Sequence, residues 1–348
     1  MNLLITGGAG FIGSNFVQYI LDQHVDIHIV NVDKLTYAGN LQNLGEVSHH
    51  PRHHFVQGDI CDRQLLDNLF EKYQIEGVIH FAAESHVDNS IKKPLSFVQT
   101  NVLGTLTLLE AARSFWMEDF GSYKTAFQHA RFHHISTDEV YGSLGMEGFF
   151  TENTPYAPNS PYSASKASSD MLVRSYYQTY GMNVVTTNCS NNYGPKQHAE
   201  KLIPTIIRRA LALETIPIYG NGQNIRDWLY VLDHCRAIEK VFFNGKSGET
   251  YLIGAHNEKT NVEIAQEICD FLDMEKPIPV NEKGINSYKQ LIEYVEDRPG
   301  HDFRYAIDDT KLRNELGFKF KYVFNKGIEE TIQFYLKQYN RTYITSNI

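Results

Sequence analysis

A tyrosine and a lysine stand four residues apart at Tyr162 and Lys166. In a helix this spacing places both side chains on one face. Because free tyrosine titrates at about pH 10, it acts as a base near neutral pH only when positive charge stabilises its phenolate. The lysine ammonium and a nicotinamide ring would both supply such charge. The pair could then deprotonate an alcohol whose carbon loses a hydride, although the same spacing is common on packed helices that do no chemistry.

A glycine-rich segment near the start of the chain supports the catalytic interpretation. Gly7, Gly10 and Gly13 follow a predicted strand and open a predicted helix, which is the setting of a dinucleotide-binding turn. Glycines let the backbone approach a pyrophosphate, and the helix N-terminus attracts it. Asp33 ends the next predicted strand, 20 residues after Gly13, where an acid binds a ribose hydroxyl and repels a 2′-phosphate. We therefore expect NAD rather than NADP.

The elements that must position these residues alternate between strands and helices. Short apolar runs predict strands over residues 2–6, 26–32, 54–57, 77–82, 131–136 and 183–188, and helical periodicity predicts helices over residues 64–73, 97–115 and 162–180. An apolar stripe that begins at Ile12 predicts a further helix after the glycine-rich turn. This alternation is typical of βαβ units around a parallel sheet. Candidate ligand-binding segments lie at the carboxyl ends of the strands, as expected for open α/β sheets.

We predict an α/β fold: a Rossmann-type doubly wound parallel sheet with a smaller C-terminal α/β substrate lobe. The NAD-binding domain is expected over residues 1–193 and the nucleotide-sugar lobe mainly over residues 194–348. The predicted strands 215–219 and 249–253 are separated by longer polar segments, which suggests the smaller lobe. The chain is expected to cross back to the first domain around residues 225–260.

Composition narrows the class of protein. The net charge is -9, from 32 Lys and Arg against 41 Asp and Glu, so no overall basic field favours nucleic acid or an anionic membrane. No apolar run approaches the roughly 18 residues of a membrane helix, and a basic signal region is missing, so we expect a cytoplasmic protein. Four scattered cysteines without a C-x-x-C pattern indicate reduced thiols. The histidine-rich segment 49–54 is interpreted as a solvated loop, and no metal site is expected.

Together, these motifs resemble the extended short-chain dehydrogenase/reductase superfamily and, within it, the dTDP-glucose 4,6-dehydratases. The resemblance runs through residues 33–40, 83–88, 136–142, 188–195, 201–204, 226–228 and 297–301. It implies a dTDP-sugar substrate, NAD as a recycled catalyst, and a homodimer with a four-helix interface built from the helices over 97–115 and 162–180. The implied product, dTDP-4-keto-6-deoxyglucose, is an entry to deoxysugar biosynthesis such as that of dTDP-rhamnose.

The resemblance also implies how the reaction is divided among side chains. Oxidation at sugar C4 acidifies the C5 proton; Glu139 is then the base at C5, and Asp138 is the acid that protonates the departing C6 hydroxyl, before NADH returns its hydride to C6. Two carboxylates with opposite duties need surroundings that separate their pKa values. Thr137 is the expected partner of the C4 oxygen, together with Tyr162 and Lys166.

Two alternatives stay open. A UDP-sugar 4-epimerase keeps the tyrosine and lysine but lacks the two carboxylates at Asp138 and Glu139. A non-catalytic protein that senses NAD or nucleotides could use the same fold, but it would not need a phenol and an amine four residues apart.

The resemblance extends to the binding residues. Catalytic residues are Thr137, Asp138, Glu139, Tyr162 and Lys166. Cofactor-binding residues are Gly7, Gly10, Phe11, Ile12, Gly13, Asp33, Lys34, Leu35, Thr36, Asp59, Ile60, Phe81, Ala82, Ala83, Ser85, Thr100, Tyr162, Lys166 and Asn192. Substrate-binding residues are Ser85, Thr137, Asn191, Lys201, Leu202, Pro217, Ile218, Tyr219, Arg226, Asn261, Asp297, Arg298 and His301. Arg226 is the best candidate for the diphosphate, because a guanidinium offers paired donors to phosphate oxygens.

Overall fold

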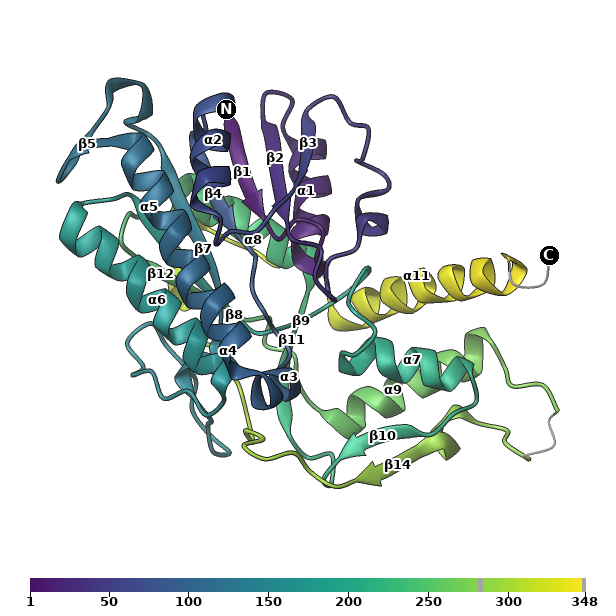
Figure 1. Ribbon diagram of the computed structural model, residues 1–348. Helices are drawn as coiled ribbons and strands as arrows, with labels where there is room; N and C mark the ends of the chain where they lie inside the picture. Colours follow the sequence, from purple (N-terminus) through teal and green to yellow (C-terminus); the bar gives the residue numbers. More distant parts are fainter. Residues whose placement is uncertain (281–283, 346–348) are drawn as a thin grey trace.

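A seven-stranded parallel sheet forms the centre of the molecule (Figure 1). The computed structural model describes residues 1–280 and 284–345. The sheet has the order β12-β8-β7-β4-β1-β2-β3, and every neighbouring pair in it is parallel. Its strands are β1 (Asn2–Thr6), β2 (His28–Asp33), β3 (His53–Gln57), β4 (Gly77–His80), β7 (Arg131–Thr137), β8 (Val184–Cys189) and β12 (Thr250–Ile253).

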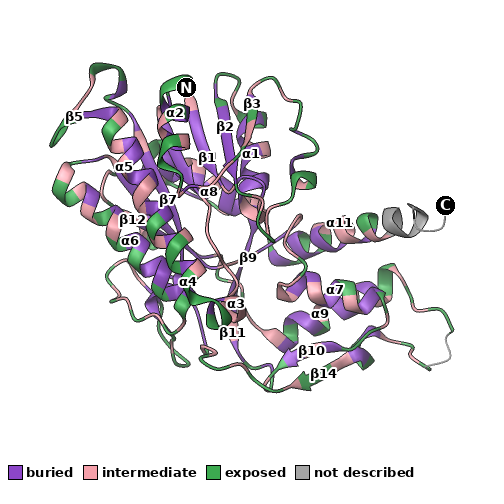
Figure 2. Cartoon of the chain, in the orientation of Figure 1, coloured by how far each residue is buried: buried purple, intermediate pink, exposed green. Residues whose placement is uncertain are grey.

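Helices cover both faces of this sheet, because its strands carry apolar side chains on both sides. In β1, Leu3 and Ile5 join the core under α1 (Phe11–Gln23) and α8 (Val231–Asn244). Leu4 points the other way, into the core under α2 (Arg63–Tyr73), α5 (Thr105–Trp116) and α6 (Pro161–Tyr180). This alternation follows from the two-residue period of a strand, and buried residues accordingly fill both layers (Figure 2).

The strand order creates a place for a ligand. From β1 the chain builds outward to β2 and β3 on one side, and then returns to place β4, β7, β8 and β12 on the other side. The change of direction between β1 and β4 leaves a crevice outside the carboxyl ends of the strands, where doubly wound sheets bind ligands. The predicted α/β fold class is therefore confirmed, and the strand ends converge where the candidate site residues lie.

A second group of elements packs beside the sheet, at the lower right of Figure 1. It contains α7 (Leu202–Leu211), β10 (Ile216–Tyr219), α9 (Asn261–Glu275), β14 (Ile292–Val295) and α11 (Phe324–Thr345). Ile206, Ile264 and Ile332 are fully buried in its own apolar core. A small sheet with the order β13-β11-β9 contributes β9 (Asn191–Tyr193), β11 (Ile225–Tyr230) and β13 (Glu258–Thr260).

Shorter elements connect these layers. They are η1 (Leu41–Leu44), α3 (Val87–Lys92), α4 (Pro94–Phe97), η2 (Val98–Gly104), β5 (Met117–Asp119), β6 (Ser122–Tyr123), η3 (Thr125–Phe127), η4 (Asp138–Tyr141), η5 (Tyr288–Leu291) and α10 (Thr310–Leu316). The single helix predicted over residues 97–115 is thus the end of α4 followed by η2 and most of α5.

The predicted strand 249–253 belongs to the central sheet. The polar segments around it suggest the smaller lobe, but it lies within residues 225–260, where the chain is expected to return to the first domain. β12 pairs with β8 at the edge of the central sheet, with Thr250 opposite Thr186. Tyr251, Leu252 and Ile253 are fully buried, as expected for a parallel strand covered on both faces. The return of the chain around residues 225–260 explains this placement, and the domain boundary after residue 193 stays a prediction.

The histidine-rich segment is only partly a loop. His53 lies in β3, is 8% exposed and contacts the Val47 carbonyl through Nδ1 at 3.0 Å; the prediction of a solvated loop over residues 49–54 is wrong there. Among the described residues, no cluster of His, Cys, Asp or Glu side chains is arranged to hold a metal ion. Within residues 1–280 and 284–345, no helix combines the length and apolar character needed to cross a membrane.

Candidate active site

The turn between β1 and α1 is built from glycines that leave no room for a side chain. Gly7 has a φ of +74°, and a Cβ there would lie 2.6 Å from the backbone nitrogen of Ala82. A Cβ on Gly13 would lie 2.3 Å from the Gly7 carbonyl oxygen. The N-cap of α1, Gly10, supplies no side-chain cap. The residues present therefore fit a dinucleotide, whose pyrophosphate would approach the backbone and the N-terminus of α1.

Acidic side chains at the ends of β2 and β3 shape the next part of the site. The Asp33 carboxylate accepts hydrogen bonds from the backbone amides of Ala9 at 2.9 Å and Leu35 at 2.8 Å, while burial raises the pKa of this carboxyl. After β3, Asp59 forms an ion pair of 2.7 Å with Lys34. This side of the crevice therefore offers fixed acceptors to a ribose and an adenine.

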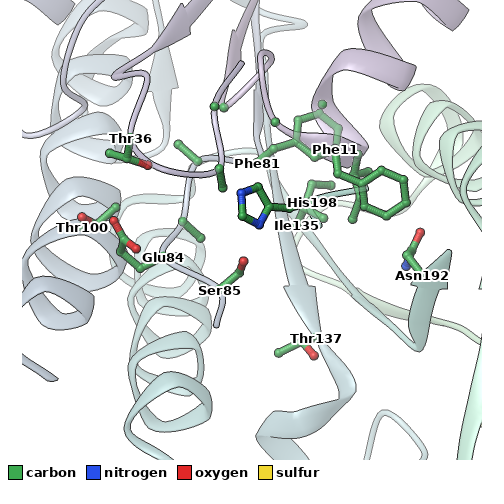
Figure 3. Close-up of a pocket in the computed structure, with 18 of the residues that line it drawn as sticks. Phe11, Thr36, Phe81, Glu84, Ser85, Thr100, Ile135, Thr137, Asn192 and His198 are labelled. Carbon is green, nitrogen blue, oxygen red and sulfur yellow. The ribbon is translucent and has the colours of Figure 1, made fainter. Parts of the chain in front are cut away.

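A single cavity joins the glycine turn to the catalytic candidates. Figure 3 shows Ser85, Thr137 and Asn192 around this cavity, although they come from different parts of the chain. Leu35 is the one predicted cofactor residue that does not line it. The predicted cofactor residues along its wall are Gly7, Gly10, Phe11, Ile12, Gly13, Asp33, Lys34, Thr36, Asp59, Ile60, Phe81, Ala82, Ala83, Ser85, Thr100, Tyr162, Lys166 and Asn192.

The N-terminal turn of α6 holds the tyrosine and lysine beside the sheet. A capping box between Ser160 and Ser163 fixes the start of the helix. Tyr162 is 8% and Lys166 4% exposed, and Lys166 Nζ donates to the Ile135 carbonyl at 2.8 Å. Burial raises the pKa of Tyr162 well above its ordinary value and lowers that of Lys166. A phenolate here would therefore depend on positive charge from Lys166 and a bound nicotinamide.

At the end of β7, Thr137 holds the two carboxylates in place. Its hydroxyl accepts the Glu139 amide hydrogen at 3.3 Å and donates to Asp138 Oδ1, also at 3.3 Å. Thr137 is thereby the N-cap of η4. Asp138 is 1% exposed, and its Oδ2 is buried without a hydrogen-bond partner among the described residues. The strand end therefore presents an enclosed carboxyl to the cavity.

The surroundings of the two carboxylates differ. Burial, followed by the neighbouring charge of Glu139, holds the pKa of Asp138 well above its usual range. Burial also raises the pKa of Glu139, but Lys201, Arg298 and Arg226 act in the opposite direction. Positive charge around Glu139 favours an ionised base, whereas Asp138 is better placed to hold a proton.

Part of the predicted substrate site reaches the same cavity. Ser85, Thr137, Asn191 and Lys201 line it, and Lys201 Nζ donates to the Ser85 carbonyl at 3.1 Å. The remaining predicted substrate residues do not line this cavity: Leu202, Pro217, Ile218, Tyr219, Arg226, Asn261, Asp297, Arg298 and His301. They lie on α7, on β10, on β11, at the start of α9 and after β14.

Some of these outer residues contact one another. His301 Nδ1 lies 2.7 Å from Asp297 Oδ1, and the His301 ring meets the edge of Tyr219. Arg298 lies 3.6 Å from Asp88, which links the segment after β14 to α3. By contrast, Ile218 is 1% exposed and belongs to the apolar core of the C-terminal elements, so its side chain does not face a ligand.

Arg226 is buried and tightly held. Its guanidinium lies 4.1 Å from the centre of the Tyr305 ring and donates to the carbonyls of Ile225 at 2.7 Å and Asp302 at 2.9 Å. Its positive charge acts to lower the pKa of both Asp138 and Glu139. The arginine predicted to bind a diphosphate is thus preorganised by backbone contacts, close to the acid and base candidates.

Sequence reasoning missed several residues of the cavity wall. Glu200 directly precedes Lys201 and lies 3.9 Å from His86. His198 meets the edge of the Tyr37 ring and stands inside the cavity in Figure 3. Glu200 could have been predicted, because it is a carboxylate next to the predicted substrate residue Lys201. Nothing in the sequence pattern marked the other missed residues. The residues missed include Glu84, Cys189, Ser190, Gln197, His198 and Glu200.

Comparisons with known proteins show the family of this chain. Residues 4–331 match the family described as GDP-mannose 4,6 dehydratase. The dTDP-glucose 4,6-dehydratase of Neisseria meningitidis is 54% identical over 335 residues, covering 96% of this chain and 93% of the relative. The dTDP-glucose 4,6-dehydratase of Streptomyces venezuelae, solved with NAD bound, has a TM-score of 0.86 and 43% identity, covering 99% of this chain and 98% of that chain.

An epimerase of the same fold is more distant. The UDP-glucose 4-epimerase of Thermotoga maritima has a TM-score of 0.82 but only 27% identity, covering 97% of this chain and 99% of that chain. The fold is therefore shared with epimerases, while the sequence favours the dehydratases, and the resemblance drawn from the motifs is confirmed. The chain belongs to the dTDP-glucose 4,6-dehydratase family of the extended short-chain dehydrogenase/reductases.

Proposed function

We propose that this chain converts dTDP-glucose to dTDP-4-keto-6-deoxyglucose as a hydro-lyase. NAD, when bound, accepts the hydride of sugar C4 and returns it to C6. One observation carries the proposal: a single cavity is lined by the dinucleotide turn and by all five catalytic candidates, Thr137, Asp138, Glu139, Tyr162 and Lys166. A dehydratase needs this full set, because oxidation and elimination take place on neighbouring carbons of one bound sugar.

The proposed oxidation step uses the α6 pair. Tyr162, as phenolate, takes the proton of the C4 hydroxyl while the C4 hydride departs. Lys166 contributes positive charge to the phenolate, and Thr137 donates to the oxygen that becomes a carbonyl. All three side chains are buried, so their interactions act in surroundings of low dielectric constant, where they are stronger than in water.

The proposed elimination uses the two carboxylates in opposite forms. Glu139 removes the C5 proton, which the C4 carbonyl has made acidic. Asp138 gives its proton to the C6 hydroxyl, which leaves as water. This division is supported by the basic side chains around Glu139 and the enclosed, partly unpartnered carboxyl of Asp138. Glu139 then returns its proton to C5 as the hydride reaches C6.

Nucleotide and diphosphate binding is proposed for the outer residues. Arg226 and Lys201 supply positive charge near the sugar end, and Tyr219, Arg298 and His301 gather where β10 and the segment after β14 meet. Ser85 and Asn191 line the cavity and would hydrogen-bond the sugar. NAD and the dTDP-sugar are both anionic. The net charge of -9 is compatible with their binding because positive side chains are gathered at the proposed site.

Parallel assays with dTDP-, UDP- and GDP-glucose test the proposed function. We expect the purified chain to form a base-labile keto sugar from dTDP-glucose without net consumption of NAD. Formation of the C4 epimer alone would instead identify an epimerase. Absence of any transient reduced-nicotinamide absorbance with all three sugars would favour a non-catalytic sensor, the second alternative.

We also propose a homodimer. Exposed apolar side chains lie on α4, η2 and α6: Leu95 is 67%, Val98 49%, Leu103 50% and Met171 58% exposed. Burial of such surface is the main driving force of association, and two copies of these helices would form a four-helix interface.

A location in the cytoplasm and a role in making dTDP-rhamnose stay predictions.

A further inference from the structure

Asp302, in the segment after β14, connects the proposed diphosphate site to the start of the catalytic helix. It directly follows the predicted substrate residue His301. Its carboxylate accepts hydrogen bonds from Asn159 Nδ2 and from the Tyr305 hydroxyl, both at 2.6 Å. Its backbone carbonyl accepts from Arg226 at 2.9 Å. The side chain and the backbone of one residue therefore join the loop before α6 to β11.

The partner of the Asp302 carboxylate lies at the entry to α6. Asn159 directly precedes Ser160, the N-cap whose capping box fixes the first turn of this helix. Tyr162 follows Asn159 by three residues. The backbone of the entry is also close to the segment before Asp302, because a Cβ on Gly300 would lie 3.4 Å from the Asn159 carbonyl oxygen. The contact with Asp302 therefore holds the chain just before the turn that carries Tyr162.

The other side of Asp302 fixes the position of Arg226. The guanidinium lies 4.1 Å from the centre of the Tyr305 ring, and the hydroxyl of this tyrosine is held by the Asp302 carboxylate. Asn224 donates to the same Asp302 carbonyl through Nδ2 at 3.1 Å. Arg226 is 4% and Tyr305 3% exposed, so little room is left for the guanidinium to move. A shift of Asp302 would therefore move Arg226 relative to α6.

The separation of the two sites matters because one molecule must reach both. In the proposed reaction, Arg226 holds the diphosphate while Tyr162 takes the proton of the C4 hydroxyl of the same sugar nucleotide. The hexose ring between these groups is stiff, so the protein must match its length. A misplacement of about 1 Å can cost about 10²-fold in rate. A contact that sets the distance between β11 and α6 therefore affects the chemistry without touching the sugar.

We propose that Asp302 and Asn159 form a positioning pair, which places sugar C4 against Tyr162 while Arg226 holds the diphosphate. This inference rests on the proposed dehydratase function. The pair acts through Tyr162 and Arg226 and takes no part in the chemistry itself. Breaking it should slow the oxidation of C4 but leave nucleotide binding unchanged, because Arg226 keeps its bonds to the carbonyls of Ile225 and Asp302.

A reversal of the pair tests this role. Asn159→Asp sets two carboxylates against each other and should push the loop before α6 away from Asp302. Adding Asp302→Asn restores one donor and one acceptor with the partners exchanged, and the new amide oxygen can still accept from Tyr305. Asn159 is exposed, and a carboxylate before a helix N-terminus is favoured by the helix dipole, so Asn159→Asp should fold.

Three comparison proteins complete the design. Asn153→Ala, an exposed asparagine in the same connection between η4 and α6, is the control. Burial is the largest cause of the raised pKa of Glu139, and the charge of Asp302 adds to it. The double variant is therefore compared with Asp302→Asn alone, which lacks the same charge, as well as with the wild-type chain. Thermal melting of every variant is measured first.

In Asn159→Asp, we expect kcat for dTDP-glucose to fall about tenfold, while the Kd of dTDP, measured by calorimetry, changes less than about twofold. The double variant should recover the kcat of Asp302→Asn, and Asn153→Ala should keep that of the wild-type chain. Parallel loss of dTDP affinity and rate in Asn159→Asp would indicate a general structural fault and overturn the positioning role. A double variant no faster than Asn159→Asp would overturn it as well.

A second readout follows the oxidation step directly. In a Glu139→Gln background, elimination is blocked, so reduced-nicotinamide absorbance on rapid mixing with dTDP-glucose reports the oxidation of C4 alone. Asn159→Asp should slow its appearance about tenfold in this background, and Asp302→Asn should restore it. An oxidation rate equal to that of Glu139→Gln alone would overturn the proposal. A wild-type chain that forms no keto sugar would instead refute the proposed function.

Discussion

Asp170 Oδ1 lies 3.1 Å from His134 Nε2, and both side chains are buried behind the catalytic face of α6. Asp170 Oδ2 accepts from the Tyr156 hydroxyl at 2.9 Å and from Asn188 Nδ2 at 3.1 Å. Asp170 follows Lys166 by one helical turn, and its charge acts to raise the pKa of that lysine. The carboxylate therefore joins β7, β8 and α6 and supports the positive charge beside Tyr162.

Replacement of this carboxylate should alter both stability and catalysis. In Asp170→Asn, lost charge and mismatched hydrogen bonds should lower the free energy of unfolding by about 1–3 kcal/mol. The pKa of Lys166 should fall further, so the alkaline limb of the kcat profile should move to lower pH while KM changes little. Asp67→Asn, which removes a partly exposed ion pair with Arg63 on α2, is the control. An unchanged kcat profile in Asp170→Asn would contradict the link to Lys166.

Buried histidines should make the fold sensitive to acid. Burial lowers the pKa of His134 to about 4 and that of His234 to about 3, from an ordinary 6.5. Because the folded pKa lies below the unfolded one, stability is fully present above pH 6.5 and is lost as the pH falls towards these values. Each histidine contributes on the order of 3 kcal/mol. Urea unfolding between pH 7 and pH 4 measures this loss.

A variant separates this effect from general acid denaturation. His134→Asn should reduce the dependence of unfolding free energy on pH in that interval, although it lowers stability at pH 7. His49→Asn, on the exposed loop before β3, should leave the slope unchanged. Equal slopes for His134→Asn and the wild-type chain would show that His134 does not titrate on unfolding.

Removal of the base should separate oxidation from elimination. In Glu139→Gln the C5 proton is no longer accepted, so keto-sugar formation should fall by about 10²-fold or more. Oxidation at C4 uses Tyr162, and reduced-nicotinamide absorbance should still appear on mixing with dTDP-glucose. Glu147→Gln, in the exposed segment after η4, is the matched control. Wild-type turnover by Glu139→Gln would remove Glu139 from the mechanism.

The glycine turn gives a test of cofactor binding. In Gly7→Ala the new Cβ would meet backbone atoms of Phe81 and Ala82 within 3 Å, at a φ of +74°. The turn must shift, so we expect the purified protein to carry much less NAD, measured by absorbance after denaturation. Gly145→Ala has no atom within 4 Å of its Cβ and should retain the cofactor. Full NAD occupancy in Gly7→Ala would show that the turn does not approach it.

The proposed dimer is tested on its exposed apolar side chains. Leu103→Glu combined with Met171→Glu places charge on η2 and α6, and should convert a dimer to a monomer in light scattering after size-exclusion chromatography. Met274→Glu, at a more exposed position on α9, should not change the mass. A wild-type monomer at micromolar concentration would contradict the dimer.

The sequence by itself determined the alternation of strands and helices in the first half of the chain and the residues for the oxidation step. Short apolar runs mark the strands of the central sheet, which are covered on both faces. Helical periodicity marks the helices, because each must bury one apolar face. The glycines at Gly7 and Gly13, the acid at Asp33 and the Tyr162/Lys166 spacing follow local rules of backbone space and helix geometry. The family resemblance added the roles of Asp138 and Glu139, which their positions in the chain do not supply.

Only the tertiary structure decided which distant residues meet. β12 entered the central sheet because strand pairing depends on the path of the whole chain, and periodicity carries no information about that path. The same is true of the contacts of Asp170 with His134 and of Lys201 with Ser85. It is also true of the basic groups Lys201, Arg298 and Arg226 that act on Glu139. The sequence named two adjacent carboxylates; their different burial and neighbours, which separate a proton donor from a proton acceptor, exist only in the folded chain.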